Sequence, residues 1–258
     1  MKLNGKVKKR EPMTDTQLLL TITICIFFGM YFLAMAIWGG GFLRWQQLFD
    51  MLNNNASLII VACGLTIVMI GGGIDISVGG VTALVVMSCI VHMNNGGSIF
   101  TAILLALGIG IAFGLVQGYL ISYLEIQPFI ITLAGMFFAR GMTTIVSLEP
   151  QKIAHEGFKQ LMNTKIQIPW LGYTAKNGNL IPARMEIGVV VALLIVVIVF
   201  VLLKKIRLGR HFYAMGGNSQ SAMMLGVNVK RTRFYSYLIS GTLSGIAGFV
   251  FMMHTGAG

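Results

Sequence analysis

The sequence has little charge, and acidic residues are its scarcest charged type. Only 10% of the 258 residues are charged, against about 25% in an ordinary soluble domain. A water-soluble fold of this size cannot bury a chain that is 56% hydrophobic, because most of its residues still touch water. Disorder is excluded as well, since disordered chains combine low hydrophobicity with high charge. The composition therefore indicates a protein whose solvent is mostly lipid.

Cysteine is also scarce, and clustered reactive side chains are missing. Cys25, Cys63 and Cys89 all lie inside apolar runs, so we interpret them as core residues and expect neither a disulfide framework nor a thiolate metal site. The histidines are scattered, with no pair at metal-ligand spacing. No Ser-His-Asp or paired-carboxylate arrangement is visible. We therefore predict no enzyme activity, no metal and no cofactor.

The 8 acidic residues stand against 19 Lys and Arg, which gives a net charge of +11. In a soluble protein this excess would suggest nucleic acid as a partner. No stretch joins basic residues to exposed stacking aromatics, so we expect no nucleic-acid binding. Membrane proteins instead concentrate Lys and Arg in their cytoplasmic loops, and we adopt that interpretation.

Long windows with little charge predict an all-α fold, a polytopic transmembrane bundle of about seven spans. A helix needs about 20 apolar residues to cross the bilayer core. The turn-forming cluster 94–98 divides the longest window into two crossings. The second and third spans are short and are joined by a glycine-broken segment near 71–80. The predicted spans are 17–38, 56–71, 79–93, 99–124, 128–147, 185–203 and 234–253.

The first span could be mistaken for a signal peptide. It follows a basic start, and Ala34-Met35-Ala36 resembles a cleavage site. Its apolar stretch is longer than the roughly 7–15 residues of a signal peptide's apolar region, so we expect a retained membrane span.

Basic residues set the predicted orientation. Five of them lie in 1–16 and seven in 204–233, which contains no acid. The positive-inside rule places both segments in the cytoplasm, and the six crossings between them agree. Residues 148–184 then form an extracellular loop, although its four lysines and one arginine count against this orientation. We predict a cytoplasmic N-terminus, 1–16, followed by a single transmembrane domain, 17–258.

The densest motif places five glycines around one carboxylate, Asp75, between two apolar spans. Glycine lets the backbone turn and lets another helix or a ligand come close. A carboxylate at membrane depth usually pairs or lines a wet cavity. One interpretation is a hinge beside a polar translocation path. The other is a tight turn, with Asp75 as the N-cap of a helix that begins near Ser77 or Val78. The candidate hinge residues are Gly72, Gly73, Asp75, Ser77 and Gly79.

Arg140 lies inside a predicted span and is a further candidate for the translocation path. An arginine at such a place commonly faces a wet cavity, a carboxylate or backbone carbonyls. Asp75 is one candidate partner. The alternative is an arginine that extends toward the outer interface.

Small residues recur every four positions on two spans, so each set lies along one helix face. Such stripes allow helices to approach closely in lipid, and we interpret both as packing faces. They are Gly110, Gly114 and Gly118 on the fourth span and Ser240, Ser244 and Gly248 on the seventh.

The segment 204–233 predicts a short cytoplasmic helix between two spans. Gly216-Gly217-Asn218 is typical of a turn. Ser219 or Ser221 can then cap a helix that ends at Met224.

Gly226 can terminate this helix. Ala222 and Leu225 are three positions apart and are expected to share its face. An apolar face with basic flanks suits docking onto another subunit. The alternative partner is the surface of anionic membrane lipid.

Four motifs resemble the permease subunits of ribose-type carbohydrate ABC importers. GGIDISVG (72–79) is similar to the family's GGIDLSVG, and PFIITLAGMFFARG (128–141) to its PxFIxTLxxMxxxRG. RLGRHFYAMGGN (207–218) is similar to TxFGRxxYAIGGN, and AMMLGVNV (222–229) continues that match. The motifs keep the family's order, and the wording is closest to galactofuranose-type importers.

This resemblance implies a sugar-transport permease of the bacterial inner membrane whose ATP is hydrolysed by a separate ABC ATPase subunit. It also implies an extracytoplasmic sugar-binding protein, which either docks on 148–184 or leaves that stretch as a simple connection. A second permease subunit, identical or different, would complete the pore. The coupling segment that contacts the ATPase is then Gly216, Gly217, Asn218, Ala222, Leu225, Gly226 and Val227.

The chain also departs from the family's pattern. It stops after the seventh span, without the glycine-rich ELDAIAAVVIGGT-like segment that the resemblance leads us to expect, so we predict a C-terminally incomplete permease. Two other functions stay open: an ion-gradient-driven secondary transporter, since broken helices and a midplane carboxylate suit that class, and a membrane subunit that does not transport. The absence of G-x-x-x-x-G-K-[ST] fits a subunit without its own P-loop.

Overall fold

The structure is a computed structural model that describes residues 14–38, 44–174 and 180–258. It divides into two compact units, residues 1–48 and 49–258. The first contains α1 (Asp15–Trp38), an apolar helix of 24 residues and therefore long enough to cross a bilayer. The basic residues of the predicted cytoplasmic N-terminus precede residue 14 and lie outside the described residues.

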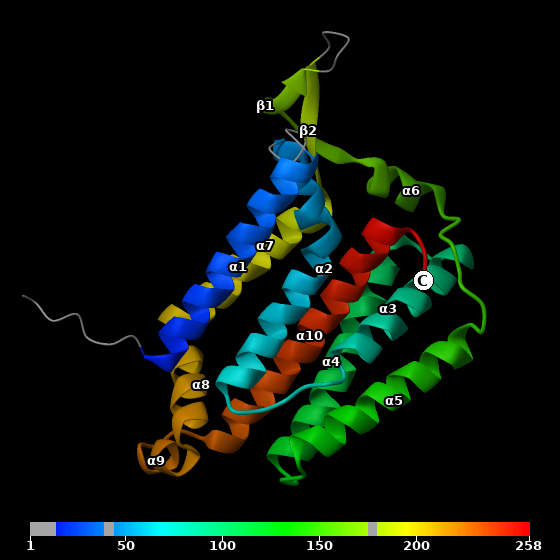
Figure 1. Cartoon of the computed structure of the whole chain (residues 1–258). Helices are drawn as coiled ribbons and strands as arrows, with labels where there is room; N and C mark the ends of the chain where they lie inside the picture. Colours follow the sequence, from blue (N-terminus) through cyan, green and yellow to red (C-terminus); the bar gives the residue numbers. More distant parts are fainter. Residues whose placement is uncertain (1–13, 39–43, 175–179) are drawn as a thin grey trace, which may run out of the picture. The chain divides into compact units, whose positions relative to one another are not determined.

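Six of the described helices are long and apolar enough to span a membrane, and a shorter apolar helix, α3, joins them. This arrangement confirms the predicted all-α polytopic fold with about seven spans (Figure 1). After α1, the apolar helices are α2 (Trp45–Ile70), α3 (Val78–Asn94), α4 (Ile99–Ser122), α5 (Pro128–Val146), α7 (Ile187–Lys205) and α10 (Val229–Thr255). The shorter polar helices are α6 (Glu156–Asn163), α8 (Arg207–Gly217) and α9 (Ser219–Met224).

The turn predicted at 94–98 separates α3 from α4. Gly96 has φ +89°, a left-handed conformation that costs glycine little. Ser98 begins the next helix, because its hydroxyl accepts a hydrogen bond from the Thr101 N–H at 3.2 Å. The longest apolar window of the sequence therefore forms two antiparallel helices, as predicted.

The second span begins earlier than predicted. The sequence indicated 56–71, but α2 starts at Trp45, and the helix continues through Asp50 and three asparagines. Asn53 is buried, and its side-chain oxygen accepts a hydrogen bond from the Glu186 N–H at 3.0 Å. Asn53, one of the polar residues before the predicted span, thus has a tertiary partner.

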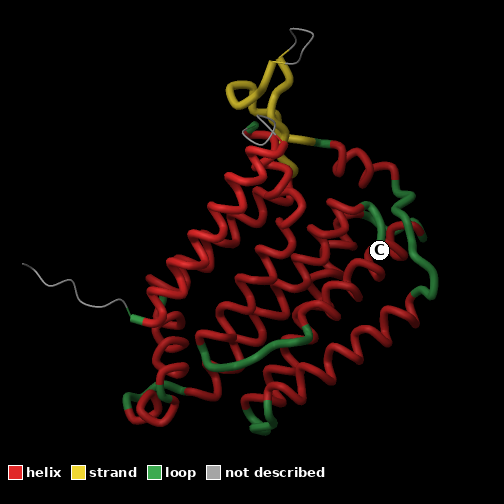
Figure 2. The backbone as a smooth tube through the Cα atoms, viewed as in Figure 1, coloured by secondary structure: helices red, strands yellow, loops and turns green. Residues whose placement is uncertain are grey.

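The stretch 148–184 contains α6 and most of a β-hairpin, the exception to the all-α prediction (Figure 2). Strand β1 (Lys165–Thr174) pairs antiparallel with β2 (Leu180–Glu186). The register shifts between Ile168 and Tyr173, a stretch that includes Pro169, which has no N–H to donate. The stretch predicted as an extracellular loop therefore contains regular secondary structure of its own.

In the second unit, α10 is the central helix, and α4 packs along it through the predicted stripe of Gly110, Gly114 and Gly118. A Cβ on Gly110 would overlap the Gly241 carbonyl, and one on Gly114 would lie 2.9 Å from Leu238 Cα. Gly248 lies against Val85 of α3. The α4 stripe therefore meets α10 at backbone contact, at Leu238 and Gly241, whereas Ser240 of the predicted α10 stripe lies against Gly64 of α2.

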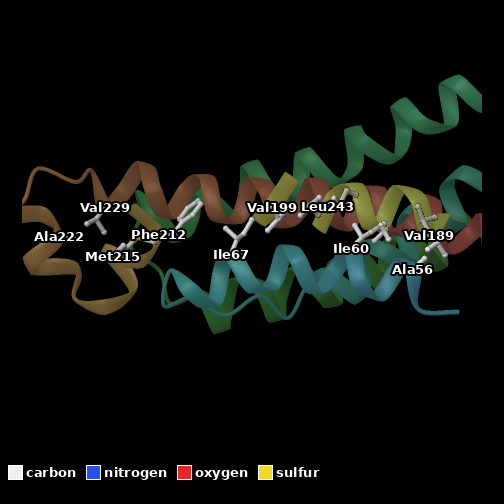
Figure 3. Packing of buried hydrophobic residues seen from close by; sticks show 14 residues of the cluster. Ala56, Ile60, Ile67, Val189, Val199, Phe212, Met215, Ala222, Val229 and Leu243 are labelled. Carbon is white, nitrogen blue, oxygen red and sulfur yellow. The ribbon is translucent and has the colours of Figure 1, made fainter. Parts of the chain in front are cut away.

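One core cluster joins α2, α7, α8, α9 and α10. Figure 3 shows Ile60 and Ile67 of α2 beside Val199 of α7 and Leu243 of α10, with Phe212 of α8 further along the same cluster. The cluster therefore continues from the apolar helices into the short ones. Figure 1 places α8 and α9 at one end of this unit and the hairpin with α6 at the other.

Candidate functional site

The glycine-rich segment between α2 and α3, residues 71–77, forms the centre of the site, and we call it the hinge. Gly72 has φ +78°, and its N–H donates to the Met69 carbonyl at 3.0 Å while the Gly73 N–H donates to the Val68 carbonyl at 2.9 Å. This pair of bonds is a Schellman ending, which needs a left-handed residue at Gly72. The chain then continues as a non-helical stretch up to Val78.

Asp75 is the buried carboxylate of the hinge, with 7% of its surface exposed. Its Oδ1 accepts hydrogen bonds from the Ser77 N–H at 3.0 Å and the Ser77 hydroxyl at 2.7 Å. Its Oδ2 accepts from the Ser240 hydroxyl of α10 at 2.7 Å. Both carboxylate oxygens are therefore satisfied by neutral donors, and the hinge is tied to α10.

The predicted N-cap role of Asp75 needs correction. Helix α3 begins at Val78, the N-cap position belongs to Ser77, and the Ser77 side chain makes no capping bond. Asp75 instead closes a short turn onto the Ser77 N–H. The carboxylate thus shapes the segment before the helix.

Ser77 connects the hinge to Gln117 of α4. The Ser77 hydroxyl lies 3.0 Å from Gln117 Oε1 and 2.7 Å from Asp75 Oδ1. One hydroxyl carries one hydrogen, so it can donate to only one of these two acceptors at a time. The sequence prediction missed Gln117, whose only signal was an amide inside an apolar span.

Tyr237 of α10 is a second residue that the sequence prediction missed. Its hydroxyl donates to the Ile74 carbonyl at 3.1 Å. A Cβ on Gly73 would lie 2.6 Å from this hydroxyl oxygen. Gly73 is therefore required by the close approach of Tyr237, and the hinge backbone is held against α10 at two places.

The hinge also touches the end of α8. A Cβ on Gly216 would overlap the Ile70 carbonyl, and one on Gly71 would lie 2.7 Å from the Met215 side chain. The structure therefore brings Gly216 of the predicted coupling segment into direct contact with the start of the hinge.

The coupling segment differs locally from its prediction. Gly216 and Gly217 belong to the last turn of α8, so they do not form the predicted turn. Asn218, rather than Ser219 or Ser221, caps α9, because its side-chain oxygen accepts from the Ser221 N–H at 2.8 Å. The sequence analysis missed Asn218 as the N-cap because Ser219 and Ser221, which are also common N-cap residues, follow it.

Gly226 ends α9 as predicted. It has φ +82°, its N–H donates to the Met223 carbonyl, and the Val227 N–H donates to the Ala222 carbonyl, both at 3.0 Å. This is again a Schellman ending.

Ala222 and Leu225 do not share a face. Ala222 is 1% exposed and packs inward, whereas Leu225 is 82% exposed. Leu225 lies just beyond the last helical residue, so the helical spacing rule does not apply to it. Leu225 and Met224 instead form an exposed apolar tip on α9, which we call the α9 tip.

Basic residues surround this end of the unit. Lys230 forms an ion pair with Glu125 of the α4–α5 loop at 2.7 Å. The Lys230 hydrogen bond and charge lower the pKa of the Glu125 carboxyl. The other basic side chains of the segment are Lys204, Lys205, Arg207, Arg210, Arg231 and Arg233.

Arg140 and Gly79 are not part of the Asp75 network. Both are exposed in the single chain. Among the described residues, no salt bridge joins Arg140 to a carboxylate, and a Cβ on Gly79 would meet open space. The proposed pairing of Arg140 with Asp75 is therefore absent from this conformation.

The family model for the permease component of branched-chain amino acid transport systems matches residues 47–258. The chain belongs to this permease family, and with its apolar helices it is a multi-pass membrane protein of bacterial type. The four sequence motifs and this match agree on a transporter subunit.

The curated relatives are transport permeases. The chain is 33% identical to the fructose import permease protein FruG of Bifidobacterium longum, over 98% of this chain and 73% of that protein. It is 38% identical to the inner membrane ABC transporter permease protein YjfF of Escherichia coli, over 95% and 71%. It is 32% identical to the galactofuranose transporter permease protein YtfT of Escherichia coli, over 78% and 54%. No solved structure matches the chain.

Proposed function

We propose that this chain is the membrane-spanning subunit of an ATP-driven sugar importer in the bacterial inner membrane. It lines part of the translocation path and couples to a separate ATPase subunit at residues 204–233. Its N-terminus and this segment face the cytoplasm, and 148–184 faces a sugar-binding protein outside. A second permease subunit completes the pore. The family and the names of the relatives support the sugar-import class.

The observation that carries the coupling proposal is the α9 tip. Met224 is 90% exposed and Leu225 82% exposed, at the end of a polar helix whose Ala222 is buried. Two large apolar side chains at such a tip gain free energy by entering a pocket on a partner. The partner is the ATPase, because Gly216 of the same segment contacts the hinge and gives the docked motor a direct connection to it.

The test is ATP-dependent uptake in proteoliposomes that contain this chain with the ATPase, second permease and sugar-binding protein encoded in its gene neighbourhood. We expect uptake of D-fructose or D-galactose that stops when the ATPase is inactivated. Uptake that survives this inactivation and is lost when ion gradients are collapsed would identify a secondary transporter instead.

Leu225→Asp tests the coupling surface. We expect it to abolish sugar-stimulated ATP hydrolysis while the chain remains in the membrane, since a charge cannot enter an apolar pocket unpaired. Leu148→Asp is the matched control, because Leu148 is 85% exposed just after α5, outside the coupling segment. Weaker binding of the variant to anionic vesicles, with unchanged ATP hydrolysis, would indicate that lipid is the partner.

A further inference from the structure

Helix α7 carries an exposed apolar face along its length. The face consists of Val190, Leu193, Leu194, Val197, Ile198 and Val201. These residues recur every three or four positions, so they lie along one side of the helix. On a helix that is long and apolar enough to span a membrane, such a face is covered by acyl chains or by another apolar helix.

Two lysines end this face. Lys204 and Lys205 follow Val201 by three and four positions, so they continue the same side of α7, and both are exposed. Val201 and the apolar residues before it belong in hydrocarbon, so the two ammonium groups fall at the depth of the lipid headgroups. The Lys204 ammonium lies 5.3 Å from the centroid of the Phe200 ring, a contact that does not neutralise its charge.

Helix α8 adds two more cations at this point. It begins tightly against α7, because a Cβ on Gly209 would overlap two backbone carbonyls in the last turn of α7. Arg210 Nη1 consequently lies 3.5 Å from the Lys205 carbonyl oxygen. Arg207 precedes Arg210 by three positions, so the two share one side of α8, and both are exposed. The α7–α8 junction therefore presents four positive charges, on Lys204, Lys205, Arg207 and Arg210, which we call the junction cations.

The junction cations have no acidic partner within the described part of the chain. The salt bridges that the structure shows there use other basic residues, namely Lys159, Lys165, Lys230 and His254. Residues 187–258, which contain both helices of the junction, include no aspartate or glutamate. Like charges held this close repel one another, so an anion lying among them is stabilising.

The occupant of the junction has to match both the charges and the apolar face beside them. An anionic phospholipid does so, because its phosphate pairs with lysine and arginine while its acyl chains lie along α7. A free phosphate ion leaves the apolar face uncovered. A water-soluble protein surface reaches the cations and does not reach Leu194 or Val197 in the hydrocarbon.

We propose that the α7–α8 junction binds an anionic phospholipid of the cytoplasmic leaflet through the junction cations. This inference rests on the proposed function for the choice of leaflet, and it separates the lipid-binding start of 204–233 from the α9 tip that docks the ATPase. The far end of α8 contacts the hinge, since a Cβ on Gly216 would overlap the Ile70 carbonyl. A bound headgroup therefore holds α8 in place against the hinge, and ATP-dependent transport depends on anionic lipid.

The first test locates the lipid by cross-linking. The assembled complex in phosphatidylcholine vesicles receives a trace of phosphatidylglycerol with a photoactivatable acyl chain, and mass spectrometry identifies the cross-linked peptides. We expect cross-links within 187–203 that unlabelled phosphatidylglycerol removes and that extra phosphatidylcholine or inorganic phosphate leaves in place.

Three results of the cross-linking experiment overturn the inference. Equal competition by phosphatidylcholine shows that the headgroup charge is not recognised. Competition by inorganic phosphate shows a site for a soluble anion. Absence of cross-links on α7 in the complex shows that lipid does not cover the face, and their presence in the isolated chain alone identifies a helix of another subunit as the cover.

The second test measures affinity as the concentration of unlabelled phosphatidylglycerol that halves the cross-linking. A basic residue near an anionic lipid surface contributes about fivefold in affinity, so Lys204→Gln/Lys205→Gln is expected to raise this concentration about thirtyfold. Lys204→Arg/Lys205→Arg keeps both charges and is expected to bind as the wild type does. Lys152→Gln/Lys159→Gln removes two charges from exposed lysines outside the junction and is the matched control for lipid binding. An unchanged concentration in the Lys204→Gln/Lys205→Gln variant overturns the inference, as does weaker recovery of the ATPase with unchanged lipid binding.

The third test compares ATP-dependent uptake in vesicles of phosphatidylcholine alone and of phosphatidylcholine with phosphatidylglycerol at 3:1. We expect phosphatidylglycerol to raise uptake by the wild type and by Lys204→Arg/Lys205→Arg, and Lys204→Gln/Lys205→Gln to lose this dependence. Wild-type uptake that is equal in the two lipids overturns the claim that the headgroup holds α8. Absence of ATP-dependent uptake in both lipids contradicts the proposed function instead, and the cross-linking result is independent of it.

Discussion

Helix α4 has two very different neighbours. Toward α10 it makes backbone contact, with Gly110 and Gly114 against Gly241 and no room for one additional carbon. Toward α5 it leaves an apolar groove of about 400 Å³, which Phe113, Gln117 and Phe138 help to line. The same helix is therefore packed to the limit on one side and loosely on the other.

We expect this difference to separate the helices that move during transport from those that do not. Glycine contacts in lipid derive their stability from close backbone approach, so a small shift breaks many contacts at once. A groove loses little when its walls move. We infer that α4 and α10 move as one body during transport and that α5 changes its distance from them, with the hinge responding through Ser77 and Gln117.

The largest effect is expected from filling the tight side. Gly110→Leu places a side chain where even a Cβ overlaps the Gly241 carbonyl. Overpacking costs about 1–3 kcal/mol and at times more, so we expect little folded protein by size-exclusion chromatography in detergent. Gly108→Leu is the matched control on the same helix, because a Cβ there meets nothing. Equal recovery of both variants would show that the α4–α10 contact is not rigid.

The second largest effect is expected at Asp75, which connects the hinge to α10. Asp75→Ala removes three hydrogen bonds and is expected to lower the free energy of unfolding by about 2 kcal/mol. Asp75→Asn keeps an oxygen for Ser77 and a polar group toward Ser240, so thermal stability should fall less. If the carboxylate positions the hinge during transport, uptake by Asp75→Asn falls more than stability does. A parallel loss of both quantities would make Asp75 a folding residue only.

Much of this architecture could be predicted from the sequence because lipid imposes simple rules. Hydropathy and length located the spans, and glycines marked the turns at Gly72, Gly96 and Gly226. The start of α2 was predicted wrongly because Asn53 looks like a span breaker until its partner is known. Asn53 finds its partner in Glu186, 133 positions away.

Only part of the candidate site could be predicted from the sequence, because some of its residues matter only through contacts with distant parts of the chain. Asp75 stands out as a lone carboxylate among glycines, so sequence alone selects it. Gln117 and Tyr237 do not stand out, since their importance comes from contacts across 40 and 163 positions with Ser77 and Ile74. Leu225 was assigned to the wrong face because helical spacing was applied one residue past the helix end. Local sequence patterns do not reveal a residue's long-range partners or the residue at which a helix ends.

We expect the side of α4 that faces α5 to tolerate added side-chain volume, which the side that faces α10 does not. Ala134→Leu adds volume to the wall of the groove, where Ala134 is exposed. Substitutions at such positions usually change stability by no more than about 0.5 kcal/mol. We expect normal folding in the chromatography assay. Poor folding would contradict the contrast between the two sides.

The smallest effect is expected from the ion pair that joins the α4–α5 loop to the start of α10. Lys230 lowers the pKa of Glu125 below its ordinary value of 4.5. The pair therefore stabilises the fold fully above that ordinary value, and its contribution is lost as the pH falls through the lowered pKa. Both side chains are exposed, 54% and 63%, so solvent and salt screen the pair.

Glu125→Gln should accordingly remove a small acid-dependent part of the thermal stability, measured between about pH 6 and pH 3. Lys230→Met should remove the same part, and the double variant no more than either single one. If this pair also restrains α5 through its loop, Glu125→Gln will change the rate of sugar uptake at neutral pH more than it changes stability. An unchanged rate would leave Gln117 and Ser77 as the route by which α5 and the hinge affect each other.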